Sequence, residues 1–444
     1  MDHLRAKTYS IANRIGFHYF PDGLRFGEKD LEIWLPRLKE LDAQWLVLKS
    51  PGNRAIPEEF IRALAQAKIK TILDLDFPLS AKPAWDDLET LLRSYGKWGL
   101  DYAILDQKPN SQSAWGSSFW KQADLAVAYA ARFRHFAEIA LDCGIKPVFA
   151  PLLPGGDFWD LAFLETALKT LSETSDAFIL NNMILSAYAW DFDRSLNWGA
   201  GGAKIWQHVK AYKVPQGSQD QRGFRTYEWY AQISEKVLGK KLPMLTLQAG
   251  LRDDPFSHVS TDLSSGIVKQ VAVYRLLRNE NVFDPDNPEK LISAIGAEVL
   301  ACSFYLLSDP SASSLNTWFN PDGTPAAVSS ELLNQISKDR ISRKSPPAMQ
   351  TITPDFKFET YILISDSLRP RIREILHNLH PFISRSKPLV GFSADEAKQA
   401  ANVLWIAYEN NVSSDEIDKL KSGGSQVRVL DPESLAAVIT ETMR

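Results

Sequence analysis

The sequence is poor in the residues that cross-link a chain or bind metals. Its 444 residues include two cysteines, Cys143 and Cys302, which lie far apart and outside any Cys-x-x-Cys or Cys/His cluster. They give no basis for a disulfide framework or a zinc site. The spacing of His, Asp and Glu suggests no other metal site, so we expect neither a metal nor a cofactor.

Long apolar runs and an excess of charge are also missing. No window approaches the ~18 to 20 uninterrupted apolar residues that a membrane-spanning helix needs. The segment Met1–Ser10 is followed by polar Asn13 and Arg14 and not by the apolar core of a signal peptide. The formal charge of -4 gives no electrostatic reason to expect nucleic acid or an anionic membrane as partner. The sequence therefore predicts a cytoplasmic protein that binds neither.

What is present is the composition of a soluble globular protein, with 45% hydrophobic and 23% charged residues. The chain also contains 13 Trp, 13 Tyr and 22 Phe. Indole and phenol rings stack on the apolar faces of sugar rings, although in most proteins aromatic residues fill the core. The aromatic content suggests a sugar ligand without establishing one.

The first three quarters of the chain alternate short β-branched or aromatic runs with longer segments of helical period. This alternation predicts parallel strands joined by helical crossovers. We expect eight strands, over Ile11–Phe20, Trp45–Lys49, Thr71–Phe77, Tyr102–Asp106, Pro147–Pro151, Ala177–Asn181, Met244–Gln248 and Ala301–Leu307. The expected helices include Lys29–Leu41 and Leu291–Leu300. Eight such units predict an α/β fold, a (β/α)8 TIM barrel over residues 1–338, with its site at the carboxyl ends of the strands.

A second domain follows. Residues 339–355 are polar and contain Pro346 and Pro347, as expected of a linker. Four strand-like runs then alternate with helical segments over residues 356–444, which predicts a small doubly wound α/β domain of the flavodoxin or Rossmann-like kind. Its first turn, Ser365 to Leu368, has no glycine fingerprint for a dinucleotide. We expect it to be a docking module, which could have a protein partner.

Two segments at predicted strand ends carry the most informative pattern. Gln107-Lys108-Pro109-Asn110 follows the fourth strand, and Gln248-Ala249-Gly250 follows the seventh. They resemble the Asn-Glu-Pro-Asn and Glu-x-Gly motifs of the clan-A glycoside hydrolases, which are retaining glycosidases on (β/α)8 barrels. The resemblance covers about residues 10–338 and extends to Trp318 and Pro325 after the eighth strand.

The resemblance implies that both catalytic glutamates are replaced. In this family one glutamate ends strand four as the acid/base and another ends strand seven as the nucleophile; here Lys108 and Gln248 stand at these positions. Retaining enzymes hold the two carboxyl groups ~5 to 5.5 Å apart. A glutamine amide is a poor nucleophile, and a lysine ammonium is too weak an acid to replace a carboxylic acid. Hydrolysis through these two positions should fail.

A ligand could still bind where the catalytic groups are missing. The candidate ligand-binding residues lie at strand ends, in the two motifs and in the long segment 183–222, because a connection of that length is usually functional. They are His18, Tyr19, Gln107, Lys108, Asn110, Trp190, Trp198, Gln248 and Trp318. For the histidine and the tryptophans, a packing role is the alternative. For Lys108, an ion pair with Asp106 is the simpler interpretation and a Schiff-base lysine the other.

Three functions remain open. The first is a glycoside-hydrolase-like barrel with degenerate catalytic positions that binds a carbohydrate or glycoconjugate at its strand-end face. The second is an active glycosidase with displaced carboxylates such as Asp106 and Asp253, which an inverting mechanism would need ~6.5 to 9.5 Å apart. The third is a structural or interaction protein whose cleft is plugged by side chains. The first predicts a ligand-sized, aromatic-lined cleft that contains Lys108 and Gln248.

Overall fold

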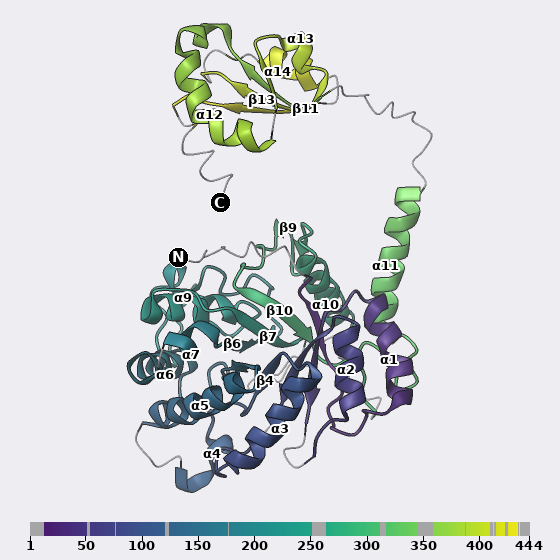
Figure 1. Ribbon diagram of the computed structural model, residues 1–444, viewed down its shortest axis with the longest axis vertical. Coiled ribbons are helices and arrows are strands. Elements are labelled where there is room, and N and C mark those ends of the chain that lie inside the picture. The colour runs from purple at the N-terminus through teal and green to yellow at the C-terminus, as the bar shows by residue number, and fades with distance from the viewer. Residues whose placement is uncertain are drawn as a thin grey trace. The chain divides into compact units, whose positions relative to one another are not determined.

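The chain divides into two compact units, Met1–Ser342 and Arg343–Arg444, which we describe one at a time (Figure 1). The computed structural model describes residues 13–50, 54–75, 77–119, 124–175, 177–250, 263–310, 317–344, 358–386, 388–408, 412, 414–421, 425–433 and 435. None of the helices within these ranges is long and apolar enough to cross a membrane.

The first unit is a (β/α)8 barrel. Its parallel strands follow one another in the order β5-β4-β3-β2-β1-β10-β7-β6. They are β1 (Ile15–His18), β2 (Trp45–Lys49), β3 (Lys70–Asp74), β4 (Tyr102–Ile104), β5 (Lys146–Val148), β6 (Leu185–Tyr188), β7 (Met244–Ala249) and β10 (Val299–Phe304). Parallel bridges between Val148 and Ile184 and between Leu152 and Ala187 join β5 to β6 and close the barrel.

Glycine at position 16 is required by the close approach of three strands. Gly16 of β1 pairs with Trp45 of β2 on one side and with Ser303 of β10 on the other. A Cβ at this position would lie 2.7 Å from Ser303 Oγ and 2.9 Å from Trp45 Cβ. The barrel can therefore close tightly around β1 only because this residue has no side chain.

Helices surround the barrel strands (Figure 1). They are α1 (Glu28–Glu40), α2 (Glu58–Gln66), α3 (Trp85–Trp98), α4 (Gln112–Phe119), α5 (Leu125–Asp142), α6 (Asp160–Thr174), α7 (Ala177–Asn182), α8 (Gly202–Ile205), α9 (Thr226–Leu238), α10 (Leu263–Leu277) and α11 (Ala327–Lys344). Their apolar faces pack on the strands in one continuous hydrophobic core. An antiparallel hairpin, β8 (Phe283–Asp284) with β9 (Asn287–Leu291), precedes β10.

Local sequence accounts for where several helices begin and end. Helix α3 has Asp86 and Asp87 in its first turn, where their charges interact favourably with the helix dipole. It ends at Gly99, whose left-handed φ of 103° suits glycine and stops the helix. Such signals depend on neighbouring residues alone and are therefore readable from the sequence.

Two predicted elements are wrong. The segment predicted as the sixth strand forms helix α7, and the strand is β6, whose residues Leu-Ser-Ala-Tyr include no β-branched side chain. The helix predicted over residues 291–300 does not form; the chain there leads from β9 into β10. In addition, α11 continues to Lys344 and so extends into the segment expected to be a linker.

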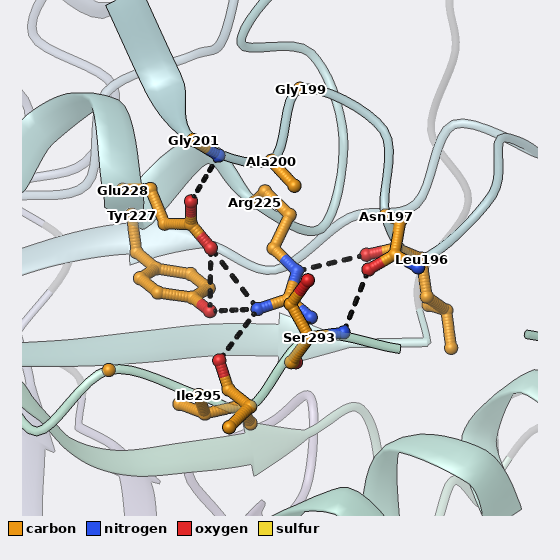
Figure 2. Close-up of polar contacts among 12 residues, drawn as sticks. Leu196, Asn197, Gly199, Ala200, Gly201, Arg225, Tyr227, Glu228, Ser293 and Ile295 are labelled. Carbon is orange, nitrogen blue, oxygen red and sulfur yellow. Dashed lines mark hydrogen bonds and ion pairs between the residues drawn. The ribbon is translucent and has the colours of Figure 1, made fainter. Parts of the chain in front are cut away.

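A buried arginine binds carbonyl groups of the irregular segment before β10 (Figure 2). The side chain of Arg225 is fully buried and donates hydrogen bonds to the carbonyl oxygens of Ser293 and Ala294, the latter at 3.2 Å. It also donates to Leu196 O at 3.1 Å and lies 3.1 Å from Glu228 Oε1. One guanidinium thus joins the β6–α9 connection, helix α9 and the segment before β10.

The second unit is a four-stranded parallel sheet in the order β12-β11-β13-β14 with helices on both faces. Its elements are β11 (Phe358–Ile364), the 3-10 helix η1 (Asp366–Arg371), α12 (Ile372–Ser386), β12 (Leu389–Gly391), α13 (Ala394–Ala397), β13 (Ala400–Ile406), α14 (Ser414–Lys421) and β14 (Gln426–Leu430). Two separate hydrophobic clusters, one with Ile375 of α12 and one with Leu420 of α14, cover the two faces of the sheet. This is the doubly wound α/β arrangement that the sequence predicts.

Replacing the buried arginine should destabilise the barrel strongly. Arg225→Met removes the cation that pairs with Glu228 and the donor to three backbone carbonyl oxygens, and the loss of one partner of a buried ion pair costs ~3 to 5 kcal/mol. The matched control is Arg62→Met, which removes an exposed ion pair with Glu58 on α2 and should cost at most ~1 kcal/mol. Urea unfolding of both variants measures the difference, and equal losses would contradict the role of Arg225.

Candidate functional site

A cleft opens where the barrel strands end. A cavity of about 330 Å³ is lined by Lys49, Asp74, Gln107, Lys108, Ser111, Ser113, Ala114, Tyr188 and Gln248. A second cavity of about 160 Å³ shares three of these residues, Lys49, Asp74 and Gln248, and adds His18 and Tyr305 among others. We call the two together the strand-end cleft. Its larger part lies at the lower end of the ~300 to 1,000 Å³ of small-molecule sites.

The two positions that lack glutamate both line this cleft, and both have unusual backbones. Lys108 has φ 48° and Gln248 has φ 56°, in the left-handed region that costs non-glycine residues ~1 to 3 kcal/mol. Each backbone N–H has a partner on another strand end: Lys108 N donates to Pro151 O at 3.0 Å, and Gln248 N donates to His18 Nε2 at 3.1 Å. The surrounding chain therefore holds both residues in place.

Gln107 connects one wall of the cleft to another. Its Nε2 donates to Asp74 Oδ1 at 2.7 Å, and its Oε1 accepts from the Tyr188 hydroxyl at 2.9 Å. Because Asp74 accepts at one end and Tyr188 donates at the other, an amide is the group that fits both. Gln107, which follows β4, thereby fixes the side chains that end β3 and β6.

The Trp190 side chain contacts both residues that stand at the motif glutamate positions, Lys108 and Gln248. Its ring stacks on Tyr188 with centroids 4.3 Å apart and an interplanar angle of 16°. Its Nε1 donates to Gln248 Oε1 at 3.1 Å, and Lys108 Nζ lies 5.1 Å from the Trp190 ring centroid and 5.6 Å from that of Tyr188. The indole therefore orients the Gln248 amide and attracts the Lys108 ammonium by a cation–π interaction.

His18 is a neutral acceptor. Burial, followed by the charge of Lys49, lowers the pKa of His18 to about 3, because both disfavour the protonated ring. The neutral ring can accept the hydrogen bond from Gln248 N, which an imidazolium could not. His18 thus positions Gln248 at the cleft, and it meets Tyr305 edge-on at a centroid distance of 5.8 Å.

Asp160 is a buried carboxylate outside the cleft. It accepts hydrogen bonds from Gly155 N at 2.9 Å, Gln221 Nε2 at 2.7 Å and the Tyr230 hydroxyl at 2.9 Å. Burial raises the pKa of Asp160 to about 6, even though these three donors favour the charged form. It ties the β5–α6 loop to the long connection and to α9.

Two predicted ligand-binding residues lie in the core. The Tyr19 side chain is buried among Phe20, Phe26 and Trp34. The Trp318 side chain is fully buried and meets Phe17 edge-on at a centroid distance of 5.0 Å. Neither lines the strand-end cleft, because each side chain packs against other aromatic rings of the core.

Two further predicted residues stabilise loops. The Asn110 side chain donates to Leu153 O at 2.8 Å and accepts from Leu153 N at 2.8 Å, which fixes the loop after β5. Trp198 donates to Asp220 Oδ1 at 3.0 Å, and Arg194 lies over its ring. Trp198 therefore belongs to the long β6–α9 connection and is not a lining residue of the cleft.

Of the two displaced carboxylates that the sequence analysis named, the structure describes Asp106. Its side chain is buried and forms a bidentate ion pair with Arg132 of α5, with Arg132 Nη2 2.8 Å from Oδ1 and Nε 3.0 Å from Oδ2. The pairing of Asp106 with Lys108 that the sequence suggested is therefore replaced by a pairing with Arg132. Asp253 lies outside the described residues.

The structure adds cleft residues that the sequence analysis did not select. Lys49 and Asp74 end the neighbouring strands β2 and β3 and pair in register. Tyr188 ends β6, and Tyr305 follows β10. Their only sequence signal is their position at strand ends, which many polar residues share. Among the described residues, no group of three His, Cys, Asp or Glu side chains could hold a metal ion.

No family model and no curated protein matches the chain. Among solved structures, it is similar to a GH128 (subgroup I) endo-beta-1,3-glucanase from Amycolatopsis mediterranei, with 11% identity and a TM-score of 0.41 over 72% of this chain and 98% of that one. A GH128 (subgroup II) endo-beta-1,3-glucanase from Sorangium cellulosum is 11% identical, with a TM-score of 0.41 over 72% of this chain and 97% of that one. A D-psicose 3-epimerase from Clostridium cellulolyticum H10 is 12% identical, with a TM-score of 0.37 over 74% of this chain and 98% of that one. These TM-scores are low, so the barrel is assigned from its strand order and closure alone.

The buried histidine should make stability depend on pH. A histidine whose folded pKa lies below its unfolded value of 6.5 stabilises the fold fully above about pH 6.5, and this contribution is lost as the pH falls toward 3. At ~1.4 kcal/mol per pH unit, the loss between pH 7 and pH 4 is about 3 kcal/mol. His18→Gln keeps an acceptor for Gln248 N but does not titrate, so its free energy of unfolding should lack this loss.

The comparison uses urea unfolding of both proteins between pH 7 and pH 4. Asp160 acts in the opposite sense, because its raised pKa makes the fold lose stability as the pH rises through about 4 to 6. That contribution is common to both proteins and cancels in the difference. A difference between wild type and His18→Gln that stays constant over this range would show that His18 is not held neutral.

Proposed function

We propose that the barrel binds a carbohydrate or glycoconjugate in the strand-end cleft and does not cleave it through the two positions where its apparent relatives carry glutamate. One observation carries the proposal: Lys108 and Gln248, from different strand ends, line the same cavity and contact the same indole. This is the arrangement that the resemblance to the clan-A glycoside hydrolases implies, with the carboxylates replaced.

The chemistry of the two side chains opposes hydrolysis. The Gln248 amide oxygen already accepts a hydrogen bond from Trp190, and an amide does not form the glycosyl ester of a retaining mechanism. The Lys108 ammonium lies over the faces of the Tyr188 and Trp190 rings, and an ammonium is too weak an acid to replace a carboxylic acid. The amides, the hydroxyls of Ser111 and Ser113 and the Tyr188 ring remain to bind sugar hydroxyls and ring faces.

The alternative of an active enzyme with displaced carboxylates has one supporting group in the described structure. Asp74 lines both parts of the cleft, whereas Asp106 is occupied by Arg132. Acid/base hydrolysis needs a second carboxylate facing Asp74. The third hypothesis, a plugged cleft, predicts that side chains fill the strand-end face, where about 330 Å³ is open.

Binding and turnover separate these functions. Isothermal titration calorimetry and reducing-sugar release should be measured against one panel of neutral and acidic oligosaccharides. We expect binding of at least one class without turnover. Turnover that disappears in Asp74→Asn would establish the enzyme instead, and the absence of binding to any member would contradict carbohydrate recognition.

Restoring both glutamates tests whether the cleft keeps the geometry of a retaining site. In Lys108→Glu/Gln248→Glu, we expect hydrolysis of a bound sugar to rise about tenfold or more above background, because general acid catalysis alone contributes ~10² to 10⁴ in rate. The two single variants are the controls and should stay inactive, since the mechanism needs both carboxyl groups. A double variant that binds the sugar but gains no activity would show that the two positions do not face one substrate.

A further inference from the structure

A second space lies among the helices that surround the barrel. Its cavity of about 440 Å³ is lined by residues of α6, α8 and α9 and by Gln207, which follows α8. It shares no lining residue with the strand-end cleft, and all of its lining residues belong to the described part of the chain. The volume falls within the ~300 to 1,000 Å³ of small-molecule sites. We call this cavity the helix groove.

Part of the lining of the helix groove is apolar. Trp229 and Ile233 lie one turn apart on α9 and so share one helix face, and they line the groove with Leu161 of α6 and Ala203 of α8. Leu161 and Ile233 are half-buried and pack on the barrel core. Trp229 is 2% exposed, and its Nε1 donates to Gly199 O at 3.0 Å. The groove therefore offers an apolar surface whose side chains are already anchored.

Two glycines bring α8 against α9 to form a wall of the groove. Gly201 and Gly202 have φ of 84° and 60°, in the left-handed region that favours glycine. A Cβ on Gly202 would lie 2.5 Å from Gln232 Nε2. The Gln232 amide donates to Gly201 O at 2.8 Å and accepts from Lys204 N at 3.1 Å. Hydrogen bonds to α9 thus fix this wall.

The charged side chains at the groove are paired. Lys236 Nζ lies 2.6 Å from Glu165 Oε1, and Lys204 Nζ lies 2.9 Å from Glu235 Oε2. The first pair joins α9 to α6, and the second joins α8 to α9. An ionic ligand would have to compete with these partners and also lose its own hydration, which is unfavourable. A neutral ligand meets neither cost.

The pair between Glu165 and Lys236 also limits the shape of a ligand. Because this pair crosses from α6 to α9, a long helix that lay along the groove would have to displace it. From Trp229 to Lys236 the lining covers seven positions of α9 (236 − 229), or ~10 Å at 1.5 Å per residue. A compact molecule of one or two rings fits this length. The Gln207 amide can bond to a polar group on it.

We propose that the helix groove binds a small neutral molecule with an apolar body of one or two rings. The apolar body packs on Leu161, Ala203 and Ile233, and its transfer from water to this surface favours binding. The paired charges at the groove disfavour an anion or a cation of the same shape. The inference goes beyond the proposed function and does not depend on it, because the two sites share no residue.

Three naphthalene derivatives with one bicyclic body test the preference for a neutral ligand. At neutral pH 1-naphthol is uncharged, 1-naphthoate is an anion and 1-naphthylmethylammonium is a cation. In calorimetric titrations of the full-length chain, we expect 1-naphthol to bind about tenfold or more tightly than either ion, because of the desolvation of the charged group. Equal affinities, or tighter binding of an ion, would overturn the neutral ligand class.

Filling the groove locates the binding site. Ala203 is an exposed residue of α8, and Ala203→Phe places a ring in the space that the ligand needs, so 1-naphthol should bind about tenfold or more weakly. The matched control is Ala131→Phe at an exposed position of α5, which should change nothing. Thermal unfolding of both variants checks that the barrel is intact. Binding that survives Ala203→Phe, or that falls equally in Ala131→Phe, would contradict the assignment to the groove.

Removing one acidic partner tests the role of the paired charges. In Glu165→Gln, Lys236 loses its carboxylate, and 1-naphthoate should gain about threefold in affinity relative to 1-naphthol, the scale of an exposed ion pair. The control Glu138→Gln removes an exposed partner of Arg134 on α5 and should leave this ratio unchanged. An unchanged ratio in Glu165→Gln would show that pairing does not exclude anions. If no probe binds, the proposal fails, whether or not oligosaccharides bind in the strand-end cleft.

Discussion

The contact between Trp190 and the two strand ends on either side of it is the interaction on which the cleft depends. The indole stacks on Tyr188, donates to Gln248 and lies beneath the Lys108 ammonium. A single buried ring therefore sets the positions of residues that are 140 positions apart in the chain (248 − 108). Since the ring is buried and held by these contacts, it keeps Tyr188 and Gln248 in fixed positions at the cleft.

The amides around this ring explain how the site is ordered without glutamate at positions 108 and 248. Gln107 satisfies an acceptor and a donor at once, Asp74 and the Tyr188 hydroxyl, which a glutamate could not do. Gln248 accepts from Trp190 while its backbone donates to the neutral ring of His18. The polar groups at the base of the cleft are paired with one another, so their order does not require a catalytic charge.

The sequence predicted most of the fold because its signals are local. The alternation of short apolar strands with segments of helical period depends on nearby residues only. The helix predicted over residues 291–300 failed because distant groups determine this segment. Arg225 binds the carbonyl groups of Ser293 and Ala294, so these carbonyls are not free to form a helix despite the apolar spacing. For the site, the two motif positions reached the cleft, but Trp318 did not, because packing in the core is invisible to a motif.

The sequence by itself determined that this protein has a barrel followed by a small doubly wound domain, and that glutamate is missing from both motif positions. Residue identity and periodicity are enough for such statements. The tertiary structure decided which polar residues line the strand-end cleft, that Asp106 pairs with Arg132, and that the Lys108 ammonium lies over aromatic rings. These facts depend on side chains that meet only when the strand ends converge, and a linear sequence does not contain their distances.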